Sequence, residues 1–345
     1  MKNTFGFLQE NKWQTLGIAL AGLGAMAIAR AAYRRVTSLD FREKVVVVTG
    51  GSRGLGLETA RILAGRGARI VLCARSQEHL EIAANELTAL GAEVLTIAAD
   101  LSHQDEAPRV IEKVIGHFGR IDVLINNAGV MMVGPENLME IEDYHRLMDA
   151  NCWSALYMIK AALPHFRVQG GGRIANICSI GGKISVPHML PYSVSKFALT
   201  GLSEGLAAEL KKDNIHITTV VPNLMRTGSP RNISLKGAHE DEYAWFKIAD
   251  SLPFLSMDAR VAASEIVKGI AAGDSEVILT PIARAASAMN GIAPGAVTTI
   301  MQWTNDFLPQ GGDQEVKKGF ESESEATTGL IGSRTDEAAV RNNQI

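Results

Sequence analysis

Residues 45–56 read VVVVTGGSRGLG, and this stretch decides the fold. The run of β-branched residues predicts a buried strand, and a helical pattern follows the glycines. Glycines let the backbone turn sharply and approach a pyrophosphate, and the N-terminus of the helix offers free N–H groups and the positive end of its dipole. The pattern therefore predicts a phosphate-binding site for a dinucleotide. The residues expected to form it are Thr49, Gly50, Ser52, Arg53, Gly54, Leu55 and Gly56.

Short β-branched runs and amphipathic helical stretches alternate from residue 44 onward. Near-continuous apolar strands separated by helices are typical of a parallel sheet with both faces covered. We therefore expect a doubly wound, Rossmann-type α/β domain over residues 42–280. The predicted strands are 45–49, 69–73, 93–98, 121–125, 173–178, 215–221 and 276–279, and two of the predicted helices are 77–90 and 104–118, with Ser76 and Ser102 as their N-caps.

The end of the second predicted strand selects the cofactor. A carboxylate there would hold the ribose 2′-hydroxyl of NAD and repel a 2′-phosphate. The chain instead reads Cys73-Ala74-Arg75, and the Arg75 guanidinium offers a bidentate fork for a phosphate. Arg53, inside the glycine loop, adds a second cation. We therefore expect NADP(H) rather than NAD, the alternative being that Arg75 is only a solvated surface residue.

Three side chains predict the chemistry. Tyr192 and Lys196 are four residues apart, which on a helix places both on one face. A free phenol ionises at about pH 10. A nearby ammonium lowers that pKa, so the pair is suited to exchange a proton with a substrate oxygen. Ser179 follows the predicted strand 173–178, at the edge of the sheet where such folds bind ligands. Its hydroxyl would donate a hydrogen bond to a carbonyl oxygen, and a serine that only caps the loop is the alternative.

Taken in order, these motifs resemble the short-chain dehydrogenase/reductase family over roughly residues 42–280. The intervals between the motifs match as well as the motifs themselves. The matching residues are Thr49, Gly50, Gly54 and Gly56 of the glycine loop, Asp100, Asn126, Asn127, Ala128, Gly129, Asn151, Ser179, Tyr192 and Lys196.

The resemblance implies a role for each matching residue. Tyr192 would be the general acid/base, Lys196 would lower its pKa and bind the nicotinamide ribose, and Ser179 would orient the substrate oxygen. Asn151 would hold a water in a proton relay. Asn223 stands where the family usually has glycine, and asparagine tolerates left-handed backbone angles better than most residues. The other implied cofactor contacts are Asp100 with Leu101 at the adenine, Asn127, Ala128 and Gly129 along the cleft, and Pro222 and Thr227 beside the nicotinamide carboxamide.

The implied reaction is hydride transfer between NADP(H) and a carbonyl/alcohol pair. Such chemistry needs no metal, and no His/Cys/Asp/Glu cluster in the sequence has the spacing of metal ligands. We expect reduction of a ketone or aldehyde. An NAD-linked alcohol dehydrogenase and a non-catalytic NADP-binding sensor or scaffold at a membrane are the alternatives, and a membrane-assembly role of the terminal segments is a further one.

Residues 1–40 differ from the rest of the chain. Residues 15–29 carry no charge, Trp13 and Tyr33 lie on either side, and several arginines follow. As a helix, residues 13–33 would span roughly 30 Å, about one hydrocarbon core. The arginines then place the large domain in the cytoplasm by the positive-inside rule. We favour a membrane anchor, while a helix lying on the membrane or on the protein and a cleaved signal peptide are alternatives.

The C-terminal part is less regular. Residues 281–309 are weakly apolar and predict a cap that covers the substrate pocket or rests on a lipid surface. Residues 310–345 are rich in Gly, Ser and Glu, which predicts a mobile tail. The apolar terminal segments favour a hydrophobic substrate, such as a lipid, steroid or retinoid-like carbonyl.

The bulk composition narrows the partners. Apolar residues make up 46% of the chain and charged residues 21%, which suffices for a large core. The net charge of −3 gives no general attraction for nucleic acid. The family resemblance is compatible with a homo-oligomer. His188 has no visible partner and is expected at the surface, and Cys73, Cys152 and Cys178 are expected as inert core residues in a reducing compartment.

Overall fold

The central sheet is parallel and has seven strands in the computed structural model, which describes residues 38–252, 256–324, 327 and 330–345, together with positions 17, 21, 22, 24, 25, 28, 29, 32 and 34. Val45 to Val48 have no exposed surface, as expected for a strand covered on both faces. The strands are β1 (Val45–Thr49), β2 (Arg69–Ala74), β3 (Val94–Ala98), β4 (Val123–Asn126), β6 (Gly172–Ile177), β7 (Ile215–Val221) and β11 (Glu276–Ile278).

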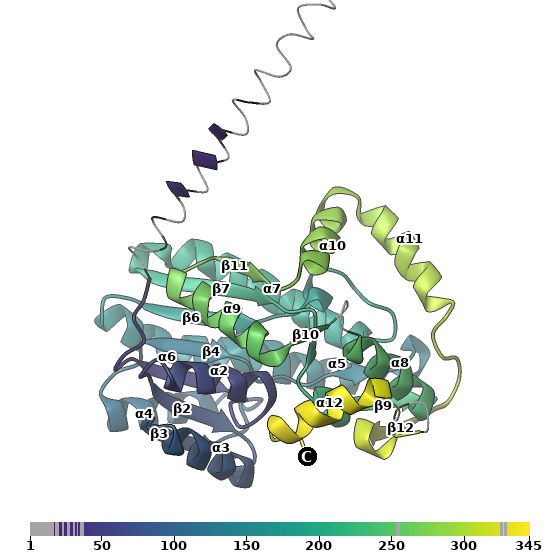
Figure 1. Cartoon of the computed structure of the whole chain (residues 1–345), viewed down its shortest axis with the longest axis horizontal. Helices are drawn as coiled ribbons and strands as arrows, with labels where there is room; N and C mark the ends of the chain where they lie inside the picture. Colours follow the sequence, from purple (N-terminus) through teal and green to yellow (C-terminus); the bar gives the residue numbers. More distant parts are fainter. Residues whose placement is uncertain are drawn as a thin grey trace, which may run out of the picture. The chain divides into compact units, whose positions relative to one another are not determined.

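The strand order is β11-β7-β6-β4-β1-β2-β3 (Figure 1). Strand β1 pairs with β2 on one side and with β4 on the other, so the chain reverses its winding direction between β1 and β4. In such sheets ligands bind beyond the carboxyl ends of the strands at this switch point. The doubly wound sheet predicted from the sequence is therefore confirmed, and each predicted strand agrees with an observed one to within two residues at either end.

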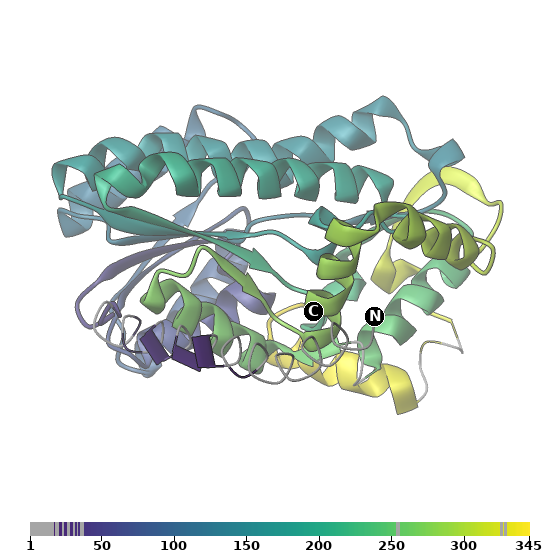
Figure 2. The ribbon, with the colours of Figure 1, turned by 90° about the horizontal axis from the view of Figure 1, so that it is seen from above.

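Helices cover both faces of the sheet (Figure 2). Helix α2 (Gly54–Ala64) packs against α9 (Ala259–Ala272) on one face, and α4 (Glu106–Phe118) packs against α6 (Ser154–Val168) on the other. The apolar residues of α4 and α6 form one buried cluster with the sheet, and this burial is the main stabilising term of the domain. The other helices are α3 (Gln77–Ala89), α5 (Ile141–Met148), α7 (Leu190–Glu209), α8 (His239–Ser251), α10 (Pro281–Ile292), α11 (Pro294–Asn305) and α12 (Leu330–Arg341).

One of the two predicted N-caps is present. The Ser76 hydroxyl accepts a hydrogen bond from the His79 N–H at 3.2 Å and caps α3. Ser102 does not cap α4, which begins after Asp105. Its hydroxyl donates instead to Asp100 Oδ1 at 2.7 Å, because this carboxylate is the nearer acceptor. The side chain of Ser102 thus belongs to the loop after β3.

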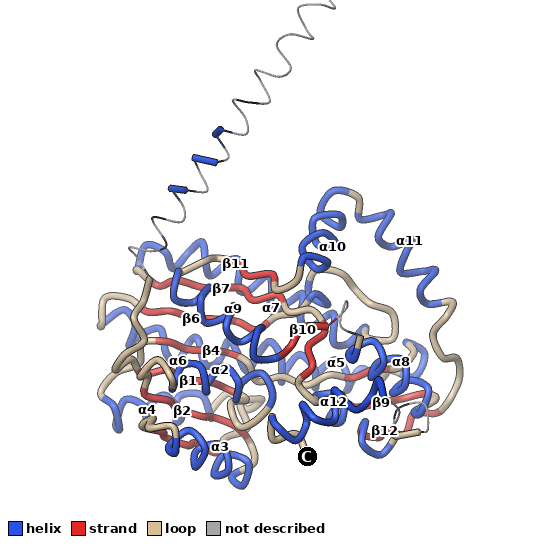
Figure 3. Tube along the Cα trace, in the orientation of Figure 1, coloured by secondary structure: helices blue, strands red, loops and turns tan. Residues whose placement is uncertain are grey.

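Short strands outside the central sheet fasten distant segments together (Figure 3). Strand β8 (Leu224–Arg226) pairs in parallel with β10 (Ser256–Asp258). Strand β9 (Ser234–Gly237) lies between β5 (Met132–Val133) and β12 (Asp313–Lys318). The sequence does not predict these pairings, because each strand has only two to six residues and its partner is far away in the chain.

The predicted N-terminal anchor lies mostly outside the described residues. No helix among the residues that are described has the length and apolar character needed to cross a membrane. Residues 40–345 form one compact unit.

The C-terminal segment corrects the expectation of a mobile tail. Residues 313–318 form a strand, 330–341 form a helix, and Ala338, Ala339 and Asn342 are buried. The polar composition suggested mobility, but the strand is stabilised by pairing with β9 and the amide side chains by polar partners elsewhere in the domain. Residues 281–309 form α10 and α11, and among the described residues none of this segment lines the main cavity.

Candidate active site

A cavity of about 720 Å³ lies at the carboxyl ends of the strands. Its volume is typical of a site for a cofactor-sized ligand. Every site residue predicted from the sequence lines this cavity except Thr49, Gly56 and Asn151. The fold therefore brings residues from Gly50 to Thr227 together, as the sequence predicts.

The glycine loop depends on glycine for one left-handed backbone conformation and for close packing. Gly50 has φ +62°, and a Cβ atom there would lie 2.9 Å from Ala128 Cα. At Gly56 a Cβ would lie 2.3 Å from the Gly50 carbonyl oxygen. Larger residues would push the start of α2 away from β1, so these glycines permit the close turn needed for a phosphate site.

Thr49 and Gly56 do not line the cavity, but they contact residues that do. The Thr49 hydroxyl accepts hydrogen bonds from the N–H groups of Asn127 and Ala128, both at 3.0 Å. The Asn127 side-chain amide donates in return to the carbonyl oxygens of Thr49 and Gly50, both at 3.1 Å. These bonds join the loop after β1 to the loop after β4, which are the two loops at the switch point.

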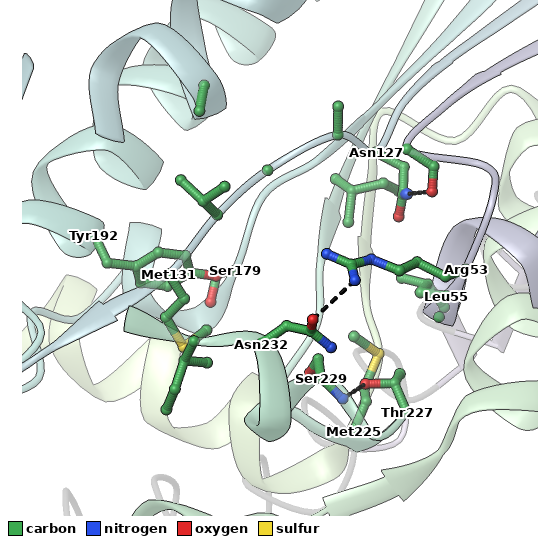
Figure 4. A pocket seen from close by; sticks show the side chains of 18 of the residues that line it. Arg53, Leu55, Asn127, Met131, Ser179, Tyr192, Met225, Thr227, Ser229 and Asn232 are labelled. Carbon is green, nitrogen blue, oxygen red and sulfur yellow. Dashed lines mark hydrogen bonds between the residues drawn. The ribbon is translucent and has the colours of Figure 1, made fainter. Parts of the chain in front are cut away.

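The cofactor end of the cavity carries positive charge. Arg53 and Arg75 both line it, and the Arg53 guanidinium donates to Asn232 Oδ1 at 2.8 Å (Figure 4). Burial lowers the pKa of Arg53, and the nearby charge of Arg75 lowers it further. The Arg75 guanidinium makes no hydrogen bond or ion pair with any residue that the structure describes. Asp100 lines the same end, and hydrogen bonds from Ser102 lower its pKa although partial burial opposes this.

The catalytic end is built by helix α7, which begins at Leu190 with Pro191 in its first turn. Tyr192 and Lys196 are one turn apart and only 7% and 5% exposed. The Lys196 ammonium donates to the Ile177 carbonyl oxygen at 2.8 Å and lies 5.8 Å from the centre of the Tyr192 ring. Both side chains therefore face the end of β6, as their spacing predicts.

The pKa of Tyr192 differs from the expectation. Burial raises it to about 12, although a hydrogen bond from the Ser179 side chain acts in the opposite direction. The ammonium of Lys196 does not offset the loss of solvation in this structure, and burial lowers the pKa of Lys196 itself. The phenol is thus protonated at neutral pH and is a proton donor (Figure 4 shows it beside Ser179).

Asn151 joins the two halves of the site rather than lining it. It lies in a π-helical turn, Asp149–Trp153, which interrupts the run from α5 to α6. Its side-chain oxygen accepts from the Val130 N–H at 2.7 Å, and its amide donates to the Val130 carbonyl oxygen at 3.0 Å and the Ser195 hydroxyl at 2.8 Å. Asn151 therefore ties the loop after β4 to helix α7. Turns of this kind are frequent at functional sites.

Pro222 and Thr227 both lie at the cavity, as the resemblance implies. The Pro222 carbonyl oxygen accepts from the Ile180 N–H at 2.7 Å, which fixes the loop after Ser179. Asn223 is not among the described residues with positive φ, so no left-handed conformation is needed at this position. The departure from the glycine of the family pattern is therefore accommodated without strain.

The expectation for His188 is corrected. Its side chain is 4% exposed, and Nδ1 lies 2.7 Å from Glu242 Oε1 of helix α8. Glu242 also accepts from Trp245 Nε1 at 2.8 Å. The partner of His188 is 54 residues away in the chain, which is why no local pattern pointed to it.

Burial also explains the cysteines and one unexpected acid. Cys73, Cys152 and Cys178 are free and buried, as predicted, and burial raises the pKa of Cys178 to about 11. Asp250 of α8 lines the cavity at 3% exposure, and burial raises its pKa to about 8. Its Oδ2 atom has no hydrogen-bond partner among the described residues. This carboxyl is thus held in its protonated form at neutral pH.

Sequence reasoning missed the cavity residues that come from outside the predicted strand ends. No local signal marks them, because they lie in α8, in the 224–232 region or in the C-terminal segment. They include Asn232, Trp245, Phe246, Asp250, Lys318, Phe320 and Gln344.

Comparison with known proteins agrees with this geometry. Residues 44–236 match the short chain dehydrogenase family. The chain is 32% identical to a dehydrogenase/reductase SDR family protein 7-like of Anopheles gambiae over 293 residues, which cover 83% of this chain and 90% of the relative. It is 36% identical to 11-beta-hydroxysteroid dehydrogenase 1A of Arabidopsis thaliana over 197 residues, or 56% of each chain.

A solved structure has the same fold. L-Sorbose reductase from Gluconobacter frateurii, crystallised with NADPH and L-sorbose, superposes with a TM-score of 0.62 and 28% identity. The match covers 70% of this chain and 97% of that one. These matches agree with the glycine loop and with the Ser179–Tyr192–Lys196 group. The chain therefore belongs to the short-chain dehydrogenase/reductase family of oxidoreductases.

Proposed function

We propose that the protein reduces the carbonyl group of a ketone or aldehyde to an alcohol with NADPH. The observation that carries this proposal is that a protonated, buried Tyr192 shares one cavity with the glycine loop and Arg75. The proposal goes beyond family membership in three respects, which are the cofactor, the direction and the substrate class.

The residues present fit NADPH. The absence of a Cβ at Gly50 lets the loop after β4 pack closely against the glycine turn, and Arg75 faces the cavity without an internal partner. Lys196 would hold the nicotinamide ribose, and Pro222 and Thr227 would border the carboxamide. When bound, the cofactor supplies the hydride. The solved relative that was crystallised with NADPH supports this choice over NADH.

The protonated phenol supports reduction as the direction. In reduction the carbonyl oxygen gains a proton while its carbon gains a hydride, so the site needs an acid. Tyr192 can donate the proton from its hydroxyl group, and Ser179 stabilises the same oxygen by a hydrogen bond. Lys196 lies close enough to stabilise the phenolate that remains, because its ammonium is 5.8 Å from the ring centre.

The substrate end of the cavity supports an apolar substrate. Its wall includes Val186, Met189, Leu224, Trp245 and Phe246. Apolar side chains gain free energy by excluding water from a hydrophobic substrate and give little orientation to a charged one. The relative named as a hydroxysteroid dehydrogenase agrees with this class. We therefore favour a lipid-like or steroid-like carbonyl.

The test is oxidation of NADPH and of NADH by the purified protein over a panel of apolar ketones and aldehydes, with Tyr192→Phe as the control. Turnover with NADPH that is lost in the variant supports the proposal. Equal turnover with NADH would contradict the cofactor assignment. Tight NADPH binding without turnover of any substrate would favour a cofactor sensor instead.

Membrane association through the N-terminal segment and assembly into a homo-oligomer remain predictions from the sequence. Deleting residues 15–29 and comparing how the two proteins partition between membrane and soluble fractions tests the first. Equal partition of both would contradict it.

A further inference from the structure

The C-terminal segment returns to the cofactor end of the cavity through strand β12. This strand pairs antiparallel with β9, with Lys318 opposite Ser234. Ser234 in turn lies opposite Met132 of β5. The last residue of β12 is therefore held one strand away from the 130–132 stretch, which follows the cofactor-binding loop that ends at Gly129.

Lys318 shares its surroundings with the two arginines predicted from the sequence. Arg53, Arg75 and Lys318 all line the 720 Å³ cavity. A second cavity, of about 610 Å³, is lined by Arg75 and Lys318 again, together with Arg146. Lys318 and Arg75 thus border the same two cavities.

Three carboxylates, those of Asp100, Glu142 and Asp149, line the second cavity beside these cations. Arg146 has an ion pair with Asp143 at 3.5 Å, and Arg53 has only a neutral partner, Asn232. The Lys318 ammonium donates to the Ser234 hydroxyl at 3.1 Å. Within the described part of the chain, neither Lys318 nor Arg75 forms an ion pair with a carboxylate. Cations that line a cavity and have no direct ion pair of their own are suited to an anionic ligand.

The neighbouring cations act on Lys318 in the same direction as its partial burial. Burial lowers the pKa of Lys318, and the charges of Arg146, Arg75 and Arg53 lower it further. A doubly charged phosphate placed among them would remove this cost and stabilise each cation.

We propose that Lys318 is a specificity-determining residue that binds the 2′-phosphate of NADPH together with Arg75 and Arg53. This inference rests on the proposed NADPH preference and adds a third cation to it, from a part of the chain 243 residues after Arg75, the difference between positions 318 and 75.

The second cavity favours the 2′-phosphate over the pyrophosphate. The residues that line both cavities include Arg75, Asp100, Ser102 and Lys318, which are on the adenosine side of the site. The glycine loop residues Gly50, Gly54 and Leu55 line only the first cavity. The pyrophosphate would lie at the N-terminus of the helix that follows that loop, whereas the 2′-phosphate would lie at the cations after the end of β2.

The segment that carries Lys318 is fastened to the cofactor site at its far end as well. The Gly54 N–H donates to the Asn342 carbonyl oxygen at 2.8 Å, and Asn343 Nδ2 donates to the Ser52 carbonyl oxygen at 3.0 Å. Asn232, the partner of Arg53, donates to Gln344 Oε1 at 2.7 Å. Lys318 is therefore held in place by tertiary structure on both sides, which reduces the entropy cost of ordering it around a phosphate.

The experiment compares Lys318→Gln with Lys317→Gln in the full chain. Lys317 is the neighbouring residue of β12 and has an ion pair with Glu315 at 3.2 Å, so its variant loses the same charge outside the cavity. Calorimetry measures the dissociation constants of adenosine 2′,5′-bisphosphate and of adenosine 5′-monophosphate, which differ only in the 2′-phosphate. Thermal unfolding checks that both variants are folded.

We expect Lys318→Gln to weaken the bisphosphate by about 10-fold and the monophosphate by less than about 2-fold, because a charged hydrogen bond to the 2′-phosphate is lost. Lys317→Gln should leave both constants unchanged, and Lys318→Arg should retain most of the affinity. Equal weakening of the two ligands, or no weakening of either, would overturn the inference.

Arg75→Gln separates this inference from the proposed function. If Arg75→Gln removes the preference for the bisphosphate and Lys318→Gln does not, NADPH preference stands and the role of Lys318 is refuted. If the unmodified protein binds both ligands equally, the NADPH preference fails and the role of Lys318 fails with it.

Discussion

At the catalytic end of the cavity, Tyr192 and Lys196 are 7% and 5% exposed, whereas Arg75 and Lys318 at the phosphate end are exposed. The first pair is held by hydrogen bonds inside the protein, and the second pair has no carboxylate partner among the described residues. Burial therefore controls the protonation of the catalytic groups, and dissolved salt screens their interactions only weakly. In the proposed function, exposed charge sets the choice between NADPH and NADH, and salt screens this charge.

The largest expected effect is a loss of kcat that distinguishes the catalytic end of the cavity from the phosphate end. Tyr192→Phe should lower kcat by about 10³-fold or more, because it removes the proton donor, while the dissociation constant of NADPH changes by less than about 2-fold. Steady-state oxidation of NADPH and fluorescence titration measure the two quantities.

Tyr157→Phe, on helix α6 outside the cavity, is the matched control and should keep full activity. A loss of NADPH affinity as large as the loss of kcat in Tyr192→Phe would show that the two ends are not independent.

Asp250 tests burial as the controlling factor at the catalytic end. Its pKa is near 3.8 in the unfolded chain and about 8 in the folded protein, so the folded state binds one more proton between these values. This contribution to the free energy of unfolding therefore falls as the pH rises from about 4 to about 8. Asp250→Asn removes it, and the variant should gain stability over the wild type across this window, on the order of 1.4 kcal/mol per pH unit at most.

Urea unfolding of both proteins at pH 4, 6 and 8 measures the difference. Asp241→Asn, on the exposed face of the same helix, should follow the wild type. A difference between wild type and Asp250→Asn that does not change with pH would contradict the raised pKa.

Arg75 tests exposed charge as the controlling factor at the phosphate end. Arg75→Gln should weaken NADPH binding by about 10- to 100-fold and NADH binding by less than about 3-fold. The reason is that only NADPH carries the 2′-phosphate that the Arg75 guanidinium would contact. Titration of both cofactors gives the ratio. Arg109→Gln, at the surface of α4, should change neither constant, and an unchanged NADPH/NADH ratio in Arg75→Gln would refute the assignment.

The smallest expected effect concerns salt. Raising the ionic strength from about 0.05 to about 0.3 M should weaken NADPH binding several-fold, because the charges that hold it are exposed. The single-turnover rate at saturating NADPH should change by less than about 2-fold, since the catalytic groups are buried. A rate that falls in parallel with the affinity would contradict the division between the two ends.

The sequence alone predicted the parts of the site that local pattern encodes. The seven strands, the glycine loop and the Tyr192–Lys196 spacing all follow from short stretches whose residue types have few other uses. Arg75 was identified for the same reason, because it directly follows a strand of the sheet. Each of these residues is placed by the element that carries it.

The residues that were missed depend on partners far away in the chain. His188 was expected at the surface because nothing near it in sequence shows Glu242, and the C-terminal segment was expected to be mobile because its composition is polar. The composition of a segment indicates the average free energy of burying its residues. It does not indicate a specific strand pairing such as that of Lys318 with Ser234.

The sequence by itself determined the fold class and predicted the cofactor site and the reacting side chains, because strand, turn and helix periodicity act over a few residues. Only the tertiary structure decided the ionisation of Tyr192 and Asp250 and the approach of Lys318 to Arg75. The physical reason is that desolvation and charge–charge repulsion depend on what surrounds a group in space, and most of those neighbours come from other parts of the chain.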